Sequence, residues 1–221
     1  MLKTTCGFMI GLVALLVLTV PDEAFAQYCA LRQPAVAFQE AFQDENVSVR
    51  SFDRQVTEEH RERIAEVLPF TIHRNELGTH TLYAAIGEKD RSRGYIHVRS
   101  ERGKWGLTEL AWAIHPNLTV KSLRVQRCRS FSQDYLQSTE FQELVRDKGV
   151  AELRTLLSKD GTALHPSVAG KVRGENQPLA IMAIRSALKT LLATEMVWET
   201  TLASLGYEAG KSIFDDASQE K

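Results

Sequence analysis

The chain has 221 residues, of which 43% are hydrophobic and 25% charged, an ordinary composition for a folded domain. Lys and Arg number 27 against 28 Asp and Glu, so the formal net charge is −1. This balance excludes a polybasic nucleic-acid binder and an acidic disordered tail, and the length favours one domain.

The N-terminal segment Met1–Ala26 has the pattern of a secretory signal peptide. Lys3 precedes a 13-residue apolar run that starts at Phe8, and Ala24-Phe25-Ala26 has the small residues of a cleavage site. The run is shorter than the roughly 20 residues that a membrane-spanning helix needs. The sequence therefore predicts export, with a buried core helix and an uncleaved membrane anchor as the open alternatives.

Cleavage after Ala26 leaves two cysteines, Cys29 and Cys128. In an oxidising compartment they favour one disulfide between the N-terminus and the middle of the domain, and two unpaired buried thiols are the alternative. No C-x-x-C or H-E-x-x-H motif occurs, so the sequence predicts neither a thiol redox centre nor a metal site.

The rest of the chain predicts an α+β fold, in which helices flank an antiparallel sheet. Helical spacing and capping residues predict helices over Pro34–Phe42 and Thr57–Leu68, within an N-terminal helical extension over 27–70. Alternating apolar residues and turn signals then predict a meander of about four antiparallel strands between Thr79 and Cys128. Leu107–Ile114 is apolar at most positions, so we expect it to be the central strand.

Helices return after the sheet. Short helices are predicted over Ser138–Asp147 and Val150–Leu157, followed by a polar, irregular segment over Ser158–Gln177. A long C-terminal helix is predicted from Pro178 to about Leu205. The glycine-containing loop before Pro178 is a candidate anion site, because free backbone N–H groups and the helix dipole favour a phosphate there. A solvated connector is the alternative.

Two stretches of the chain resemble the FMN-binding domain family, which includes the flavin-carrying G subunit of the Rnf electron-transport complex and the C subunit of sodium-translocating NADH:quinone reductase. The first comprises Gly94-Tyr95 and the turn Gly103-Lys104-Trp105-Gly106, and the second is the helix around Ala180–Leu188. The resemblance covers roughly Leu82–Ala193. It implies an FMN-binding-like domain over 71–206. Beyond Gly206 the sequence itself predicts a flexible tail over 207–221.

The resemblance also implies a set of FMN-contacting residues in the turn and in the loop before the last helix: Gly103, Trp105, Gly106, Gly170, Arg173, Gly174, Asn176 and Gln177. Trp105 would stack on the isoalloxazine ring, with a surface or core aromatic as the alternative. In the family a Ser or Thr of the loop is esterified to the FMN phosphate. The corresponding Val172–Glu175 has no hydroxyl, so we expect noncovalent FMN, with Arg173 or Lys171 supplying the charge.

The sequence thus predicts an exported FMN-binding-like protein in electron transfer, in the periplasm or at the outer face of the cytoplasmic membrane. The resemblance implies a membrane-bound redox partner, and the charge balance predicts no nucleic-acid partner. The alternative is a non-catalytic exported binding or assembly module that kept the fold and lost the flavin. A third hypothesis is an unrelated secreted α+β domain, and whether the chain is an enzyme is left open.

Overall fold

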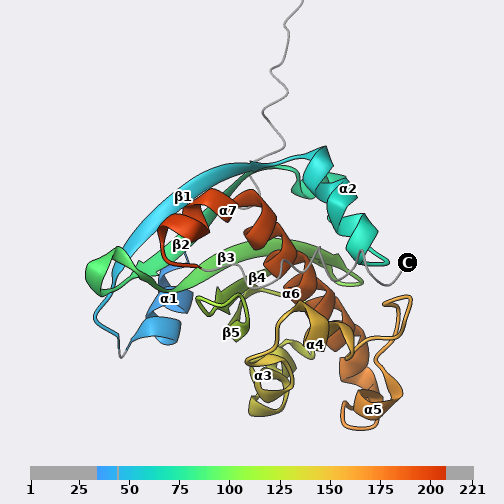
Figure 1. Cartoon of the computed structure of the whole chain (residues 1–221). Helices are drawn as coiled ribbons and strands as arrows, with labels where there is room; N and C mark the ends of the chain where they lie inside the picture. The colour runs from blue at the N-terminus through green and yellow to red at the C-terminus, as the bar shows by residue number, and fades with distance from the viewer. Residues whose placement is uncertain (1–33, 44, 208–221) are drawn as a thin grey trace, which may run out of the picture.

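The structure, a computed structural model, describes residues 34–43 and 45–207 (Figure 1). The predicted signal segment, Cys29 and the tail from residue 208 lie outside the described residues. In chain order the elements are α1 (Ala35–Phe42), β1 (Ser48–Val56), α2 (Glu58–Val67), η2 (Arg74–Glu76), β2 (Gly78–Ile86), η3 (Glu88–Asp90), β3 (Ser92–Gly103), β4 (Gly106–Ile114), β5 (Val120–Arg127), η4 (Gln133–Gln137), α3 (Thr139–Val145), α4 (Val150–Arg154), α5 (Pro166–Ala169), η5 (Gly174–Asn176), α6 (Gln177–Val197) and α7 (Glu199–Ser204).

The five strands form one antiparallel sheet in the order β1-β2-β3-β4-β5, so each strand pairs with its neighbour along the chain. This confirms the predicted α+β fold with an antiparallel meander. The sheet has one more strand than expected, because β1 lies in the segment 27–70 that was expected to be helical. In β1 only Val56 is buried, and its mainly polar sequence on a sheet edge lacks the strong apolar alternation by which the other strands were recognised.

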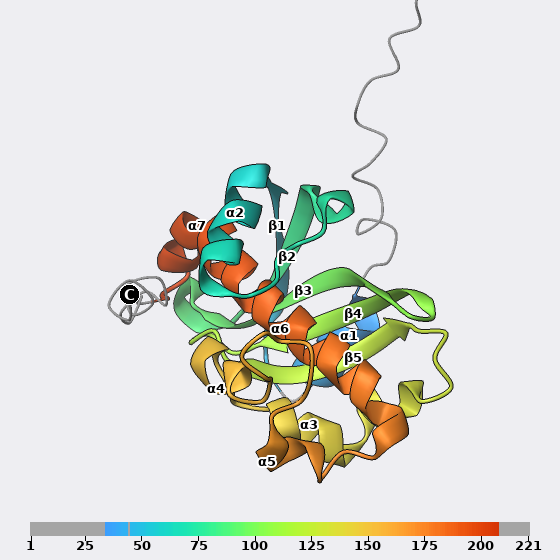
Figure 2. The same ribbon diagram turned by 90° about the vertical axis from the view of Figure 1, so that its right-hand side faces the viewer.

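Both faces of the sheet are covered. Helix α6 lies across one face and α1 packs on the other (Figures 1 and 2). Because side chains alternate along a strand, β3 sends Tyr95, His97 and Arg99 toward α6, while Ile96 and Val98 face α1. This two-sided burial explains why β3 and β4 contain so few exposed positions.

Helix α6 is buried around most of its circumference, because the sheet, α2 and α4 all pack against it. The predicted helix to Leu205 is interrupted at Trp198, which has non-helical backbone angles (φ −113°, ψ 19°) and separates α6 from α7. The indole of Trp198 is fully buried and donates to the carbonyl of Phe52 in β1 at 2.9 Å. This contact ties the end of α6 to the edge of the sheet.

The segment Ser158–Gln177, expected to be irregular, contains α5, η5 and an isolated bridge between Leu157 and Leu164. Val168 and Val172 are buried against the main core. These few apolar side chains fold the polar segment onto the domain and so fix the start of α6.

Candidate functional site

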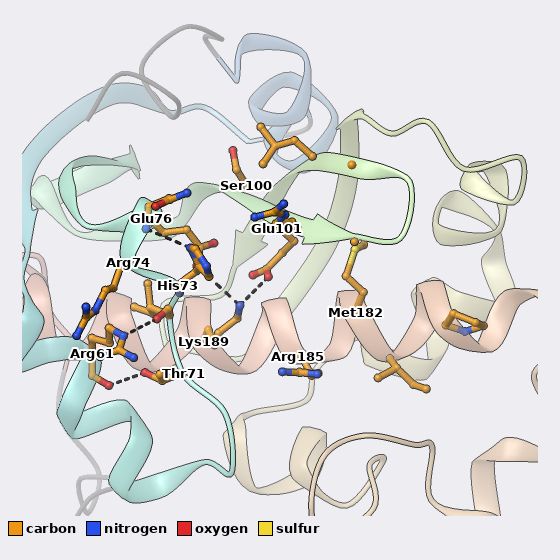
Figure 3. A pocket seen from close by; sticks show the side chains of 18 residues that line it. Arg61, Thr71, His73, Arg74, Glu76, Ser100, Glu101, Met182, Arg185 and Lys189 are labelled. Atoms are coloured by element: carbon orange, nitrogen blue, oxygen red, sulfur yellow. Dashed lines mark hydrogen bonds and ion pairs between the residues drawn. The ribbon is translucent and has the colours of Figure 1, made fainter. Parts of the chain in front are cut away.

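A groove of about 870 Å³ runs beside α6 (Figure 3). Its walls are the segment 71–76 before β2, the ends of β3 and β4 at 100–103 and 106–107, and one face of α6, with Arg61 of α2 at the side. Small-molecule sites span roughly 300–1,000 Å³, so this volume is suited to a ligand. We call it the α6 groove.

The wall formed by α6 consists of Pro178, Ile181, Met182, Arg185 and Lys189. Their spacing places all five on one helical face. At about 1.5 Å per residue, this face extends over roughly 16 Å. The end near Pro178 is apolar and the end near Lys189 is charged, so the groove favours a ligand with two chemically different ends.

A buried charge cluster (Glu76, Arg99, Glu101 and Lys189) lies at the charged end. The ammonium Nζ of Lys189 lies 2.6 Å from Oε2 of Glu101 and 4.0 Å from Oε2 of Glu76, and Oε1 of Glu76 lies 3.2 Å from Nη2 of Arg99. The Glu76 carboxylate also accepts a hydrogen bond from the backbone N–H of His73 at 2.7 Å. The cluster contains two cations and two anions, and buried charges of proteins are paired in this way.

The charges of the cluster control the ionisation of Glu76. Burial acts to raise the pKa of its carboxyl, but the neighbouring charges of Arg99 and Lys189 outweigh burial, and the pKa is lowered. Glu76 is therefore ionised at neutral pH. It helps Glu101 to hold a fixed cation, Lys189, at the inner end of the groove.

Four arginines add positive charge around this balanced cluster: Arg61, Arg74, Arg102 and Arg185. Arg61 and Arg74 share one carboxylate, Glu58. Within residues 34–43 and 45–207, neither Arg102 nor Arg185 has a carboxylate partner, and the Cζ of Arg185 lies 4.5 Å from the centroid of the Phe70 ring. The α6 groove thus has an excess of positive charge that attracts an anionic ligand.

Two buried histidines lie behind the cluster. His80 Nε2 lies 2.7 Å from the carbonyl oxygen of Glu76, His80 Nδ1 lies 3.3 Å from His97 Nε2, and His97 Nδ1 lies 2.9 Å from the Thr194 hydroxyl. Burial lowers the pKa of His80 to about 4 and that of His97 well below its usual value. Both rings are therefore neutral at pH 7, and they connect β2 and β3 to α6.

The predicted site residues of the turn divide into two groups. Gly103 and Gly106 form the first group and line the α6 groove, which Pro178 at the start of α6 also lines. Trp105, between them, is half-buried and packs against the main core, and Lys104 Nζ lies 6.0 Å from its ring centroid. Trp105 does not belong to the lining of the groove.

The predicted residues of the loop lie outside the lining of the groove: Gly170, Arg173, Gly174, Asn176 and Gln177. Gly170, Arg173 and Gly174 are exposed. The side-chain amide of Gln177 donates to the carbonyls of Ala169 and Val172, so this residue ties the loop to the start of α6. The structure therefore brings the turn glycines to α6, but does not bring the loop to the same cavity.

Sequence reasoning missed the buried charge cluster. The sequence pattern that could have revealed the cluster is the presence of charged residues within otherwise apolar segments: Arg99 and Glu101 in β3 and Lys189 in α6. Such residues are almost never fully buried unless they are paired. The fourth member of the cluster, Glu76, comes from the connecting segment before β2, and no local pattern identifies it.

Several other predictions concern cysteines, metals and membranes. Cys128 is half-buried and its Sγ lies 3.7 Å from the Thr108 hydroxyl, but Cys29 lies outside the described residues, so the disulfide stays a prediction.

No group of three or more His, Cys, Asp or Glu side chains that could hold a metal ion occurs in 34–43 and 45–207. In that same part of the chain, none of the helices combines the length and the apolar character needed to cross a membrane.

Comparison with protein-family models, curated proteins and solved structures finds no match to this chain.

Proposed function

We propose that the α6 groove binds FMN noncovalently and that the protein takes part in electron transfer. FMN is the ligand that the sequence resemblance indicates. The observation that carries the proposal is the excess of arginine charge around a small-molecule-sized groove whose buried charge cluster is already balanced.

The phosphate would bind at the arginine-rich end of the groove. Arg185 and Arg74 lie on two different walls, and in Figure 3 they lie on opposite sides of Lys189, with Arg185 on the side of Met182. A guanidinium group suits a phosphate because its planar N–H donors match two phosphate oxygens. This placement differs from the expectation of a phosphate in the loop before Pro178.

The isoalloxazine ring would bind nearer the apolar end, against Met182 and the β3–β4 hairpin. A Cβ atom on Gly103 would lie 3.1 Å from the Met182 sulfur, and a Cβ on Gly106 would meet nothing within 4 Å. Gly103 therefore lets the Met182 thioether pack closely on the hairpin, and the space beside Gly106 is open. Such sulfur atoms make favourable contacts with aromatic rings.

The hydroxyls of the groove favour noncovalent binding. Its lining includes Thr71 and Ser100. The Thr71 hydroxyl donates to the carbonyl of Arg61, and Ser100 lies on the opposite side of β3 from Glu101 (Figure 3). The Thr71 hydroxyl is therefore engaged by the backbone, and the Ser100 side chain points away from Glu101. When bound, FMN would supply the redox chemistry, while the residues of the chain bind and orient it.

A specific observation favours the second candidate, a non-catalytic binding or assembly module. Trp105 and the loop 170–177, which the resemblance assigns to flavin, do not line the groove. If flavin binding depended on those residues, the chain would keep the scaffold without the cofactor.

The two candidates are distinguished by titrating the purified protein with FMN and with riboflavin, which lacks the phosphate. We expect FMN to bind more tightly than riboflavin. Arg185→Met should weaken FMN about tenfold or more, because one charge-assisted hydrogen bond contributes about 1.5–3 kcal/mol, and should leave riboflavin nearly unchanged. Arg146→Met, the same substitution at an exposed arginine outside the groove, is the control. No FMN binding to the wild-type protein would support the module instead.

A further inference from the structure

Three side-chain oxygens of residues that line the α6 groove have no hydrogen-bond partner among the described residues: Oε1 of Glu76, Oγ of Ser100 and Oε1 of Glu101. Glu76 Oε1 is ion-paired with Arg99, and Ser100 lies on the opposite side of β3 from Glu101 (Figure 3). The third is Oε1 of Glu101, a residue that is only 6% exposed. Its other oxygen, Oε2, accepts from Lys189 at 2.6 Å. Glu101 lines the groove, and Figure 3 shows its side chain pointing toward α6. Strand alternation places Gly103 on the same face of β3.

An unpaired buried carboxylate oxygen needs an explanation. Leaving a buried acceptor without a donor costs free energy, and more so for a charged group, so nearly all such atoms in folded proteins have a partner. The fold supplies a donor to one oxygen of Glu101, a residue that lines the groove, and leaves the other oxygen without one. A donor on a ligand would complete the carboxylate.

We infer that Glu101 Oε1 accepts a hydrogen bond from an N–H or O–H group of the ligand, and so selects ligands that carry a donor at this position. The inference rests on the proposed function, which places a flavin in the groove. On FMN the donor is either the imide N–H of the ring or a hydroxyl of the ribityl chain. Glu101 is then a specificity-determining residue, separate from the arginines that bind the phosphate.

Lys189 makes this inference testable by a single substitution. In Glu101→Gln the amide has one oxygen and one NH₂ group, and only the oxygen can accept from the Lys189 ammonium. The NH₂ group must then take the place of Oε1. The substitution therefore keeps the shape of the side chain but presents a donor where the wild-type protein presents an acceptor.

The experiment measures FMN, riboflavin and lumiflavin dissociation constants for the wild-type protein, Glu101→Gln and Arg185→Met. Lumiflavin keeps the ring imide but has neither ribityl chain nor phosphate. We expect Glu101→Gln to weaken both FMN and riboflavin about tenfold or more, because two donors would face each other. Arg185→Met should weaken FMN alone. An effect of Glu101→Gln on lumiflavin identifies the imide as the donor, and its absence there identifies a ribityl hydroxyl.

The experiment distinguishes failure of the inference about Glu101 from failure of the proposed FMN binding. If Glu101→Gln binds FMN and riboflavin as tightly as the wild-type protein while Arg185→Met has lost FMN affinity, the inference is overturned and the proposed function stands. If the wild-type protein binds no FMN, both are overturned.

If Glu101→Gln does not fold, the same inference is tested by changing the ligand and keeping the wild-type protein. Riboflavin methylated at the imide nitrogen and a riboflavin analogue without ribityl hydroxyls are compared with riboflavin. A tenfold weakening for either analogue supports the inference, and unchanged affinity for both contradicts it.

Discussion

Nδ1 of His80 lies 3.3 Å from Nε2 of His97, and the environment of the pair determines the tautomer of both rings. The Glu76 carbonyl can only accept, so His80 carries its proton on Nε2, and its Nδ1 must accept from His97. Nδ1 of His97 then accepts from the Thr194 hydroxyl. A directed chain of hydrogen bonds thus runs from α6 through the sheet to the segment that holds Glu76.

Stability should fall on acidification through this pair. Burial lowers the folded-state pKa of His80 to about 4, below the unfolded value of about 6.5, so the unfolded chain binds more protons between these two pH values. The contribution of the neutral His80 ring to the free energy of unfolding is complete above pH 6.5 and is lost as the pH falls toward 4. For His80 this loss is at most about 3 kcal/mol. Urea unfolding at several pH values measures it. The double variant His80→Gln/His97→Gln should show a smaller slope over that window, and an equal slope would count against the account.

Removal of the Lys189 charge should destabilise the fold strongly. Lys189→Met leaves Glu76 and Glu101 buried with Arg99 as the remaining cation of the cluster, and breaking a buried ion pair costs about 3–5 kcal/mol. The double variant Lys189→Met/Glu101→Gln removes one charge of each sign, so we expect it to unfold at a higher urea concentration than Lys189→Met alone. Additive losses in the double variant would show that the two side chains do not interact.

Gly161 should control the position of Arg185 through Phe70. Gly161 has φ +69°, and a Cβ atom there would lie 2.5 Å from Cε1 of Phe70. Gly161→Ala should therefore lower stability by about 1–3 kcal/mol, since both the backbone conformation and the contact are unfavourable. Because Phe70 packs on Arg185, FMN affinity should also fall. Gly170→Ala is the matched control, since its φ is −70° and a Cβ would meet nothing within 4 Å. Equal thermal stability of the two variants would contradict this role for Gly161.

Flavin should leave the chain when the protein is denatured. The groove presents no suitably placed hydroxyl for an ester, so FMN bound to the native protein should appear free after denaturation and gel filtration. Flavin fluorescence that stays with the chain on a denaturing gel would contradict noncovalent binding. Thr162 and Ser167 would then be the first candidates for attachment, although their hydroxyls already contact Asp160 and His165.

The meander and the main helices could be predicted because their apolar residues follow the period of a strand or a helix. This applies to β4 and α6, whose buried faces are evident in the sequence. The same reasoning missed β1, an edge strand whose side chains are mostly exposed, and placed the end of the last helix beyond Trp198. There the indole contact with Phe52 is a tertiary interaction that no local pattern encodes.

The candidate site could be predicted only in part. Gly103 and Gly106 were identified from their turn, and both line the groove. The charge cluster depends on Glu76, 23 and 25 positions before Arg99 and Glu101, and on Lys189, which is far along the chain. Only the packing of α6 against the sheet brings them together.

The position of the FMN phosphate in a crystal structure of the complex tests the central claim most directly. The account predicts electron density for a flavin in the α6 groove, with the phosphate within hydrogen-bonding distance of the Arg185 or Arg74 guanidinium. A phosphate bound instead by the backbone of 170–177, or a flavin bound outside the groove, would contradict it.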